Sequence, residues 1–217
     1  MHTEGMDVKR VNQKAAQGEA TRAALLAAAR ELFGSQGYAA TAIEDVAARA
    51  GVTKGALYHH FGGKVDLFQA VYEQVKREIS DQVVTVFNQP DHWYALTAGC
   101  QLMIDAQLDP SARRIALEDA RSVMGVHAIR AVETRYGAVG IRGALRKAMT
   151  GGVIERQPLR ALSLLLVGAL SEACFYIADA DDPAAARDEV GRLVVRILTG
   201  LRTDSDAVTR LPIRATG

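Results

Sequence analysis

Two short segments of helical periodicity, separated by a glycine, constrain this chain more than any other feature. Ile43 and Val46 mark the apolar stripe of the first segment, which Gly51 ends because glycine adopts positive φ without strain. Thr53 follows as a candidate N-cap for the second segment, which carries Leu57 inward. Two helices joined by a turn of three or four residues that contains glycine form a helix-turn-helix. The sequence therefore predicts this motif.

A further helix is predicted before the motif, over residues 21–35, where apolar side chains share one face. Gly34 and Gly37 mark its end. Thr41 and Glu44 then have the spacing of a capping box, in which two side chains satisfy backbone amides at a helix N-terminus. We therefore expect three N-terminal helices, with Thr41 capping the second.

The third predicted helix has the polarity that a DNA-reading helix requires. Such a helix enters the major groove with its N-terminal half and its exposed face polar. Leu57 and Phe61 face inward, and Lys64, at the start of a fourth helix, is placed to meet a phosphate. The outward residues of the third helix are Thr53, Lys54, Tyr58 and His59.

The remaining chain also predicts helices, because alanine, leucine and arginine are good helix formers. None of the five prolines falls in the interior of a predicted helix, and proline is tolerated in the first turn of a helix. The predicted helices begin at about Lys64 and then cover residues 92–107, 111–123, 126–149, 158–180 and 184–202.

A resemblance to the TetR family of bacterial repressors is carried by residues 55–67, which read GALYHHFGGKVDL, and by residues 41–47, which read TAIEDVA. The segment from Ala28 to Tyr38 matches the family's first helix, so the resemblance covers roughly residues 20–75. The positions that match residues usually in contact with DNA are Thr41, Thr53, Lys54, Tyr58, His59 and Lys64. Gly55 lies on the same face and leaves few donors for base edges.

The resemblance implies a homodimer whose two headpieces read a palindromic double-stranded DNA operator, joined through the last two helices of each body. The predicted fold class is all-α, with about nine helices: an N-terminal three-helix helix-turn-helix DNA-binding domain and a C-terminal helical ligand-binding and dimerisation domain. The expected parts are a flexible arm at 1–18, the DNA-binding domain at 19–64, the effector-binding and dimerisation domain at 65–203 and a tail at 204–217. Lys9, Arg10 and Lys14 either reach a minor groove, as homeodomain arms do, or belong to a disordered tail.

The predicted helix at 158–180 is apolar over more than one face. An apolar surface this wide must be covered on two sides, by the domain's own core and by a partner subunit. The alternative is a central helix fully buried in a monomer. The residues predicted at the dimer interface are Leu162, Leu166, Leu170, Leu193, Ile197 and Leu201.

Large or weakly polar side chains in the body are candidates for the lining of a ligand pocket. Each of them has plain core packing as its alternative. Gly137, Gly140 and Gly143 recur in the helix at 126–149 and indicate close helix packing or a point where that helix bends. The pocket candidates are Trp93, Cys100, Met103, Met124, His127, Tyr136 and Phe175.

Charge and composition exclude several classes. The net charge is +1, and residues 1–76 hold nine lysines and arginines against eight acidic residues, so DNA affinity must come from local placement of cations. The two cysteines fit no metal-ligand spacing and are expected as buried thiols. His59 and His60 are adjacent, so they do not share a helical face as zinc ligands do. The apolar run Leu162–Leu170 falls short of the roughly 20 residues that span a bilayer.

The sequence therefore predicts a cytoplasmic, sequence-specific DNA-binding transcriptional regulator without cofactor, metal or membrane. We expect a repressor that a small, largely apolar ligand releases from its operator. The alternative is a dimeric regulator with no small-molecule ligand, controlled by its abundance or by a protein partner. An enzyme is not expected, because no nucleophile elbow, paired catalytic carboxylates or cofactor fingerprint occurs.

Overall fold

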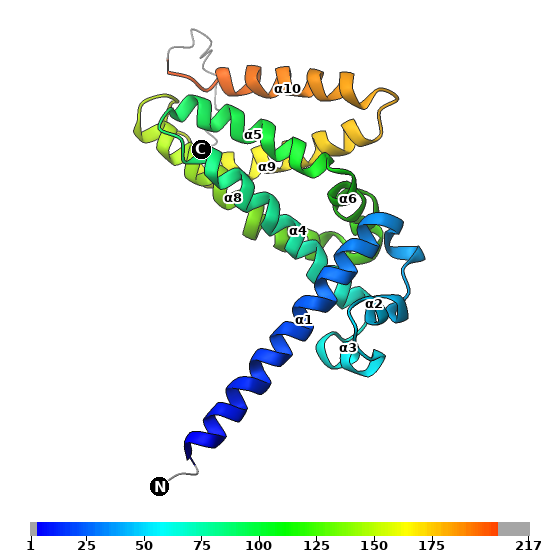
Figure 1. Cartoon of the computed structure of the whole chain (residues 1–217). Coiled ribbons are helices and arrows are strands. Elements are labelled where there is room, and N and C mark those ends of the chain that lie inside the picture. Colours follow the sequence, from blue (N-terminus) through cyan, green and yellow to red (C-terminus); the bar gives the residue numbers. More distant parts are fainter. Residues whose placement is uncertain (1–3, 204–217) are drawn as a thin grey trace, which may run out of the picture. The chain divides into compact units, whose positions relative to one another are not determined.

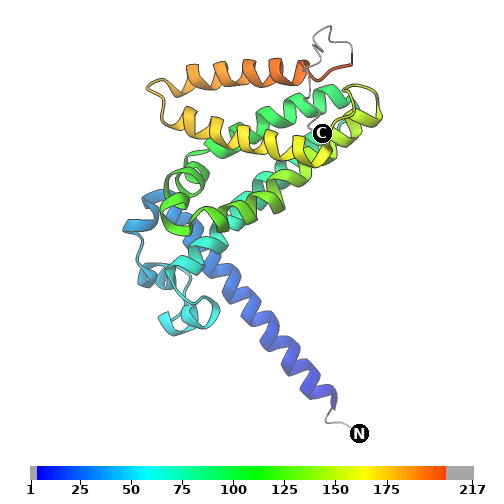
Figure 2. The same ribbon diagram turned by 180° about the vertical axis from the view of Figure 1, so that it is seen from behind.

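The computed structural model describes residues 4–203, with side chains from residue 13 onward. Helices account for almost all of this part of the chain, and the predicted all-α class is confirmed (Figures 1 and 2). If the unbroken stretch 110–124 is counted once, the described range holds nine helices, as expected. Its one β feature is an isolated bridge between Ile154 and Arg202. The predicted tail at 204–217 lies outside the described residues, as do the side chains of Lys9 and Arg10.

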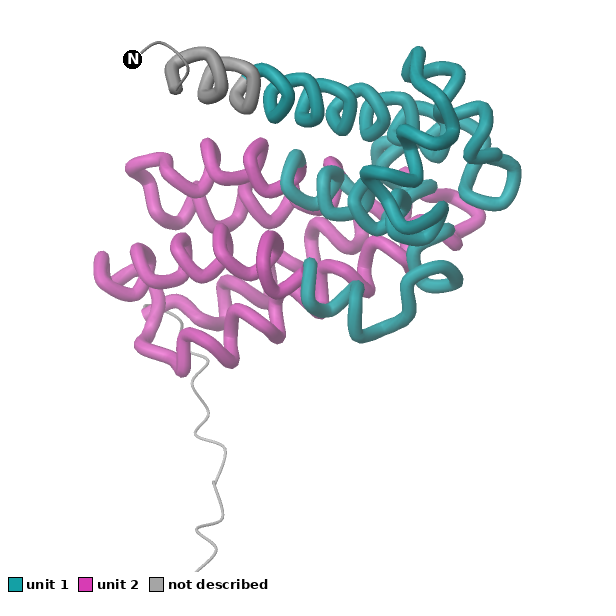
Figure 3. The backbone as a smooth tube through the Cα atoms, turned by 90° about the horizontal axis from the view of Figure 1, so that it is seen from below, with its two compact units in different colours: residues 1–78, 107–132 teal, residues 79–106, 133–217 magenta. Residues whose placement is uncertain are grey.

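The chain forms two compact units (Figure 3). Unit 1 contains the chain up to Glu78 together with Gln107–Val132, and unit 2 contains Ile79–Ala106 and the chain from Glu133 onward. The sequence placed a domain boundary after residue 64 and assigned 107–132 to the body. In the structure that segment packs with the N-terminal helices instead.

Unit 1 holds the predicted helix-turn-helix. Its N-terminal elements are α1 (Glu4–Ala40), α2 (Ile43–Arg49), α3 (Lys54–His60) and the first part of α4 (Lys64–Phe87). A helix as short as α3 is not stable alone, so its place depends on tertiary packing. The core side chains that provide this packing are Leu25, Ala29, Phe33, Leu57, Phe61, Leu67 and Phe68.

The helix α1 begins at Glu4, so the predicted start at Thr21 is wrong. Residues 13–17 are exposed, and the apolar stripe begins only at Leu25. The prediction missed these residues because apolar periodicity reveals which face of a helix is buried, not whether a segment is helical. An exposed segment rich in alanine, glutamine and lysine is helical without an apolar face.

A sharp turn at Gly37 separates the long run of α1 from its last residues, as the sequence predicted. Gly37 has φ 85° and ψ 169°, a conformation that other residues rarely adopt. The Thr41 hydroxyl donates to the Gly37 carbonyl at 2.8 Å and does not cap α2. The N-cap of α2 is Ala42, without a side-chain hydrogen bond, so the predicted capping box of Thr41 and Glu44 is wrong.

The segment 110–124 was predicted as one regular helix, and its middle differs. It consists of α6 (Pro110–Arg113), a π-helix η1 (Arg114–Asp119) and α7 (Ala120–Met124). Within unit 1 this segment packs against the end of α1. The Arg114 guanidinium donates to the Ser35 carbonyl at 2.6 Å, and the Asp119 carboxylate accepts from the Tyr38 amide at 2.8 Å. The Arg30 guanidinium donates to the Ser111 hydroxyl.

Unit 2 contains the end of α4, most of α5 (His92–Leu108) and α8 (Val126–Thr150), and all of α9 (Leu159–Ala178) and α10 (Pro183–Thr199). Helices α9 and α10 run antiparallel beside one another (Figures 1 and 2). The Phe87 ring fits against Gly99 of α5 and Gly140 of α8, where an added Cβ would lie 2.2 Å and 3.0 Å from ring carbons. Close packing, one of the two explanations considered for the glycine series of α8, therefore applies to Gly140.

The helix α9 is long and apolar enough, by length and composition alone, to cross a membrane. The expectation drawn from Leu162–Leu170, that no segment meets this test, is therefore wrong. The length of the apolar segment was underestimated because Ser171 and Glu172 end the run, whereas the helix continues to Ala178. One face of α9 is buried in unit 2, at Ser163, Leu166, Val167, Leu170, Cys174 and Ile177.

Candidate nucleic-acid interface

The orientation of α3 is fixed at both of its ends. The Thr53 hydroxyl accepts a hydrogen bond from the Ala56 amide at 3.2 Å, which confirms the predicted N-cap. Leu57 and Phe61 are 0% and 6% exposed, so the inward face is also as predicted. The opposite face of α3 is consequently turned away from the core of unit 1.

The outward face of α3 carries four of the residues predicted to contact DNA: Lys54, Gly55, Tyr58 and His59, all of which are exposed. They occur at i, i+1, i+4 and i+5, a spacing that keeps them on one side of a helix. The Tyr58 side chain is 48% exposed. Thr53 is exposed at the N-terminal end of the same face.

Lys54 does not stand alone on this face, because it forms an ion pair with Glu44 of α2. The Lys54 Nζ lies 2.5 Å from the Glu44 Oε1 and 5.9 Å from the centre of the Tyr58 ring. The hydrogen bond between the two side chains lowers the pKa of Glu44 and raises the pKa of Lys54. Both groups therefore remain charged at neutral pH. No sequence pattern indicates this pair, since its members are ten residues apart on different helices.

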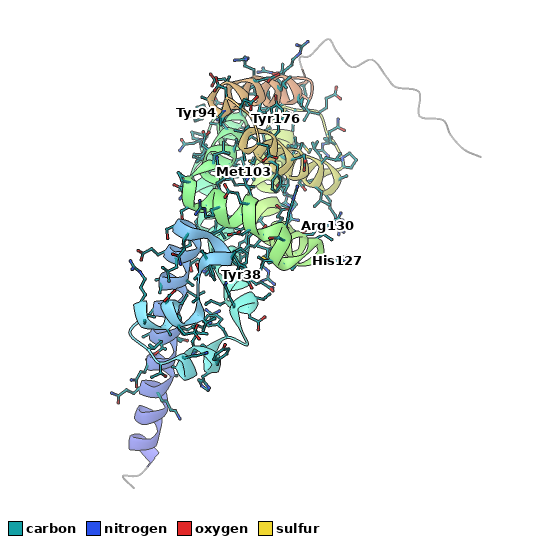
Figure 4. The ribbon with its side chains drawn as sticks, turned by 90° about the vertical axis from the view of Figure 1, so that its right-hand side faces the viewer. Tyr38, Tyr94, Met103, His127, Arg130 and Tyr176 are labelled. Atoms are coloured by element: carbon teal, nitrogen blue, oxygen red, sulfur yellow. The ribbon has the colours of Figure 1, made fainter. Side chains whose placement is uncertain are left out.

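Lys64 is held beside the turn that ends α1. Its Nζ lies 4.2 Å from the centre of the Tyr38 ring and 3.4 Å from the Ala39 carbonyl oxygen (Figure 4 labels Tyr38). The Tyr38 ring packs in turn on Phe33 and Phe68, at centroid distances of 5.8 Å and 5.2 Å. Tyr38 thus positions Lys64, a role that sequence reasoning missed because Tyr38 was noted only for its family resemblance.

Thr41 is the one predicted DNA contact whose side chain is not accessible, since it is 1% exposed. Its hydroxyl donates to the Gly37 carbonyl and accepts from the side-chain amide of Gln36 at 3.3 Å. Its side chain serves the turn between α1 and α2 and cannot reach a base edge. The family resemblance identified Thr41 as a DNA contact but did not show that its side chain is buried.

The structure offers no support for a metal at the adjacent histidines. The rings of His59 and His60 lie 5.4 Å apart in an edge-on arrangement. Among the residues that the structure describes, no group of three or more histidine, cysteine or acidic side chains could hold a metal ion.

The seven pocket candidates lie at different depths. Cys100 and Met103 are buried, whereas His127 is exposed at the start of α8 (Figure 4). Burial raises the pKa of the Cys100 thiol to about 12, so this thiol is unreactive. Both cysteines are free and buried, as predicted. The half-buried candidates are Trp93, Met124, Tyr136 and Phe175.

A second surface lies on α9 and α10 within unit 2. Leu193 and Ile197, predicted at a dimer interface, are 49% and 58% exposed. Leu166 and Leu170 are buried inside the protomer, so the predicted face of α9 is wrong. Its exposed leucines are Leu164 and Leu165, at 41% and 72%. The apolar width of α9 was recognised, but periodicity alone did not distinguish its buried leucines from its exposed ones. The other predicted members, Leu162 and Leu201, are half-buried.

Comparisons with known proteins match both parts of the chain. A model of bacterial regulatory proteins of the tetR family matches residues 25–71, and a model of the tetracyclin repressor-like C-terminal domain matches residues 93–201. The crystal structure of a TetR-family transcriptional regulator from Pectobacterium atrosepticum is 34% identical, covering 87% of this chain and 97% of that one, with a TM-score of 0.77.

Two further relatives agree with these matches. The transposon Tn10 TetC protein of Escherichia coli is 29% identical over 143 residues, which are 66% of this chain and 70% of TetC. The crystal structure of RolR is 22% identical, covering 84% of this chain and 89% of RolR, with a TM-score of 0.67, and so shares the fold.

Replacing Lys64 by alanine should weaken binding to every DNA duplex by a similar factor, because a phosphate contact carries no sequence information. The slope of log affinity against log salt should fall by about 0.9 in magnitude, the value for one phosphate contact. Fluorescence anisotropy with labelled duplexes at several salt concentrations measures both effects. Lys147→Ala, which removes a cation of unit 2, should leave them unchanged; an unaltered slope in Lys64→Ala would exclude the phosphate contact.

Proposed function

Because the chain belongs to the TetR family of bacterial regulatory proteins, we propose that it represses transcription from a palindromic operator and leaves that operator when a small, largely apolar ligand binds. Family membership makes it a DNA-binding transcriptional regulator and not an enzyme. The observation that carries the proposal is the exposed polar face of α3, with Lys54 and Tyr58, on a helix fixed by buried Leu57 and Phe61. We place this face in the major groove and Lys64 on a phosphate.

Homodimerisation is supported by the apolar side chains on the outer faces of α9 and α10. Leu165 and Ile197 are the most exposed of them, and a partner subunit would bury both. A two-fold axis makes the two surfaces identical and gives a four-helix interface from α9 and α10 of each subunit. The two headpieces then lie one DNA turn apart, about 34 Å.

The apolar length of α9 also suits a membrane, but a partner subunit explains it better. Arg160 and Glu172 both lie on this helix and are exposed, and the family model for the C-terminal domain includes the whole helix. Desolvating these charges in a bilayer would be unfavourable. An edge of a dimer interface leaves them in water, so we assign the protein to the cytoplasm.

The set of segments that make up unit 1 supports a ligand-controlled switch. Residues 107–132 belong to the same unit as α3, and they hold the end of α1 through Asp119 and Arg114. A ligand that displaces this segment would therefore move the turn at Gly37 and the start of α2. Such a ligand shifts the equilibrium only if it binds the displaced state more tightly.

We keep Trp93, Cys100, Met103, Tyr136 and Phe175, all of unit 2, as proposed pocket residues, and Met124 of unit 1 as a separate candidate. The exposed His127 is a weaker candidate for a polar anchor. The fold is compatible with a small ligand, since RolR was solved in complex with resorcinol. The alternative remains a dimeric regulator without ligand, in which the same contacts serve only to stabilise unit 1.

Replacing Leu165 by aspartate should convert the dimer to monomers, because burying a charge in the interface without an opposite charge beside it is strongly unfavourable. Multi-angle light scattering after size exclusion measures the mass. Val126→Asp is the matched control, because Val126 is 71% exposed against 72% for Leu165 and lies on α8. The assignment fails if Leu165→Asp stays dimeric, or if both variants dissociate alike.

A reporter gene whose promoter overlaps the operator should be expressed several-fold less when the protein is supplied, and a suitable apolar compound should restore expression. Asp119→Ala should keep repression but lose most of the response to that compound, because the contact to the Tyr38 amide is removed. Reporter fluorescence and duplex affinity, measured on the same variants, separate the two effects. Increased expression with the wild-type protein would refute repression, and an undiminished response in Asp119→Ala would refute this route of coupling.

A further inference from the structure

A carboxylate lies on the face that we assign to DNA. Glu44 is in the first turn of α2, its side chain is 60% exposed, and its Oε1 lies 2.5 Å from the Nζ of Lys54. The capping role expected for Glu44 is absent, since α2 has no side-chain cap. An exposed ion pair of this kind contributes little to stability. The position of Glu44 therefore calls for a reason other than folding.

The pair changes the charge that the headpiece presents to DNA. Three of its cations are offset by glutamates: Arg30 by Glu78, Arg49 by Glu31 and Lys54 by Glu44. Only the last pair includes a residue of α3. Lys64, by contrast, rests on the Tyr38 ring and has no ion pair within the described residues. Of these two proposed DNA-contacting lysines, Lys54 alone is neutralised by a neighbour.

Binding to arbitrary DNA depends almost entirely on phosphate neutralisation. A carboxylate beside Lys54 weakens this term twice, by occupying the ammonium and by repelling the phosphates. In binding to a specific sequence, a hydrogen bond to a base can offset this loss of affinity. In the major groove a glutamate accepts a hydrogen bond from the amino group of cytosine or adenine, whereas the acceptors of guanine and thymine leave its charge desolvated and unpaired. Specificity of this kind comes from penalising the wrong partner.

We propose that Glu44 is a specificity-determining residue, which lowers affinity for arbitrary duplex DNA and is compensated only where the operator presents a hydrogen-bond donor to its carboxylate. The inference rests on the proposed binding of DNA by α3. It adds an acidic residue to a reading face that the family resemblance described by its polar and basic residues.

The test replaces Glu44 by glutamine, which keeps the size and the hydrogen-bonding capacity of the side chain but removes its charge. Affinity for a duplex of arbitrary sequence should rise about 3-fold to 10-fold at low salt, and the magnitude of its salt slope should increase by up to about 0.9, the effect of one more phosphate contact. Affinity for the operator should stay unchanged or fall. The ratio of operator to arbitrary affinity should therefore drop at least about 3-fold, within the usual range for one base contact.

Glu31→Gln is the matched control, because Glu31 is also an exposed partner in an ion pair, with Arg49, but not with a residue of α3. It should leave both affinities unchanged. Thermal unfolding of the three proteins checks that the fold is retained. An unchanged ratio in Glu44→Gln, whether both affinities rise together or neither moves, would overturn the role of Glu44. A wild-type protein that does not prefer any duplex would instead overturn the proposed function itself.

Discussion

The hydrogen bond from the Tyr38 amide to the Asp119 carboxylate holds the turn that precedes the helix-turn-helix of unit 1. Gly37 reverses the chain with a positive φ, and this turn presents the next amide to Asp119. The turn also brings the Thr41 hydroxyl to the Gly37 carbonyl, immediately before α2 begins. A buried or half-buried amide left without a partner costs about 1–3 kcal/mol. Together with the hydrogen bond from Arg114 to the Ser35 carbonyl, this contact links the segment 107–132 to the start of the helix-turn-helix.

The same turn explains how the proposed DNA surface acquires its charge. The chain is almost neutral, so affinity has to arise from single cations at fixed places. The Tyr38 ring, supported by Phe33, holds Lys64 at the edge of this surface. Lys54 is placed by the capped start of α3 and is balanced by Glu44. Affinity and discrimination are therefore assigned to different side chains: Lys64, which has no ion pair in the described part of the chain, and Lys54, which is paired with Glu44.

Much of the fold followed from the sequence, because burial on one side of a helix leaves a periodic trace. The cap at Thr53, the inward Leu57 and the start of α4 at Lys64 were all predicted correctly. Features without such a trace were missed. The exposed N-terminal part of α1 has no apolar stripe, and the π-helix 114–119 contacts the end of α1, which is distant in the sequence.

The candidate site divides in the same way. The residue types on α3 predicted its polar face. The burial of Thr41 and the ion pair between Glu44 and Lys54 depend on tertiary packing, which a sequence pattern does not show. On α9, the spacing of the apolar residues did not show which of them pack in the core, so Leu166 was predicted at a dimer interface although it is buried within unit 2.

The central claim, that a symmetric pair of α3 helices reads DNA, is tested most directly by selecting bound duplexes from a random library with the purified protein. We expect enrichment of an inverted repeat whose half-site centres lie one helical turn apart, about 10 base pairs. Enrichment of a single asymmetric site, or of no sequence at all, would contradict the claim.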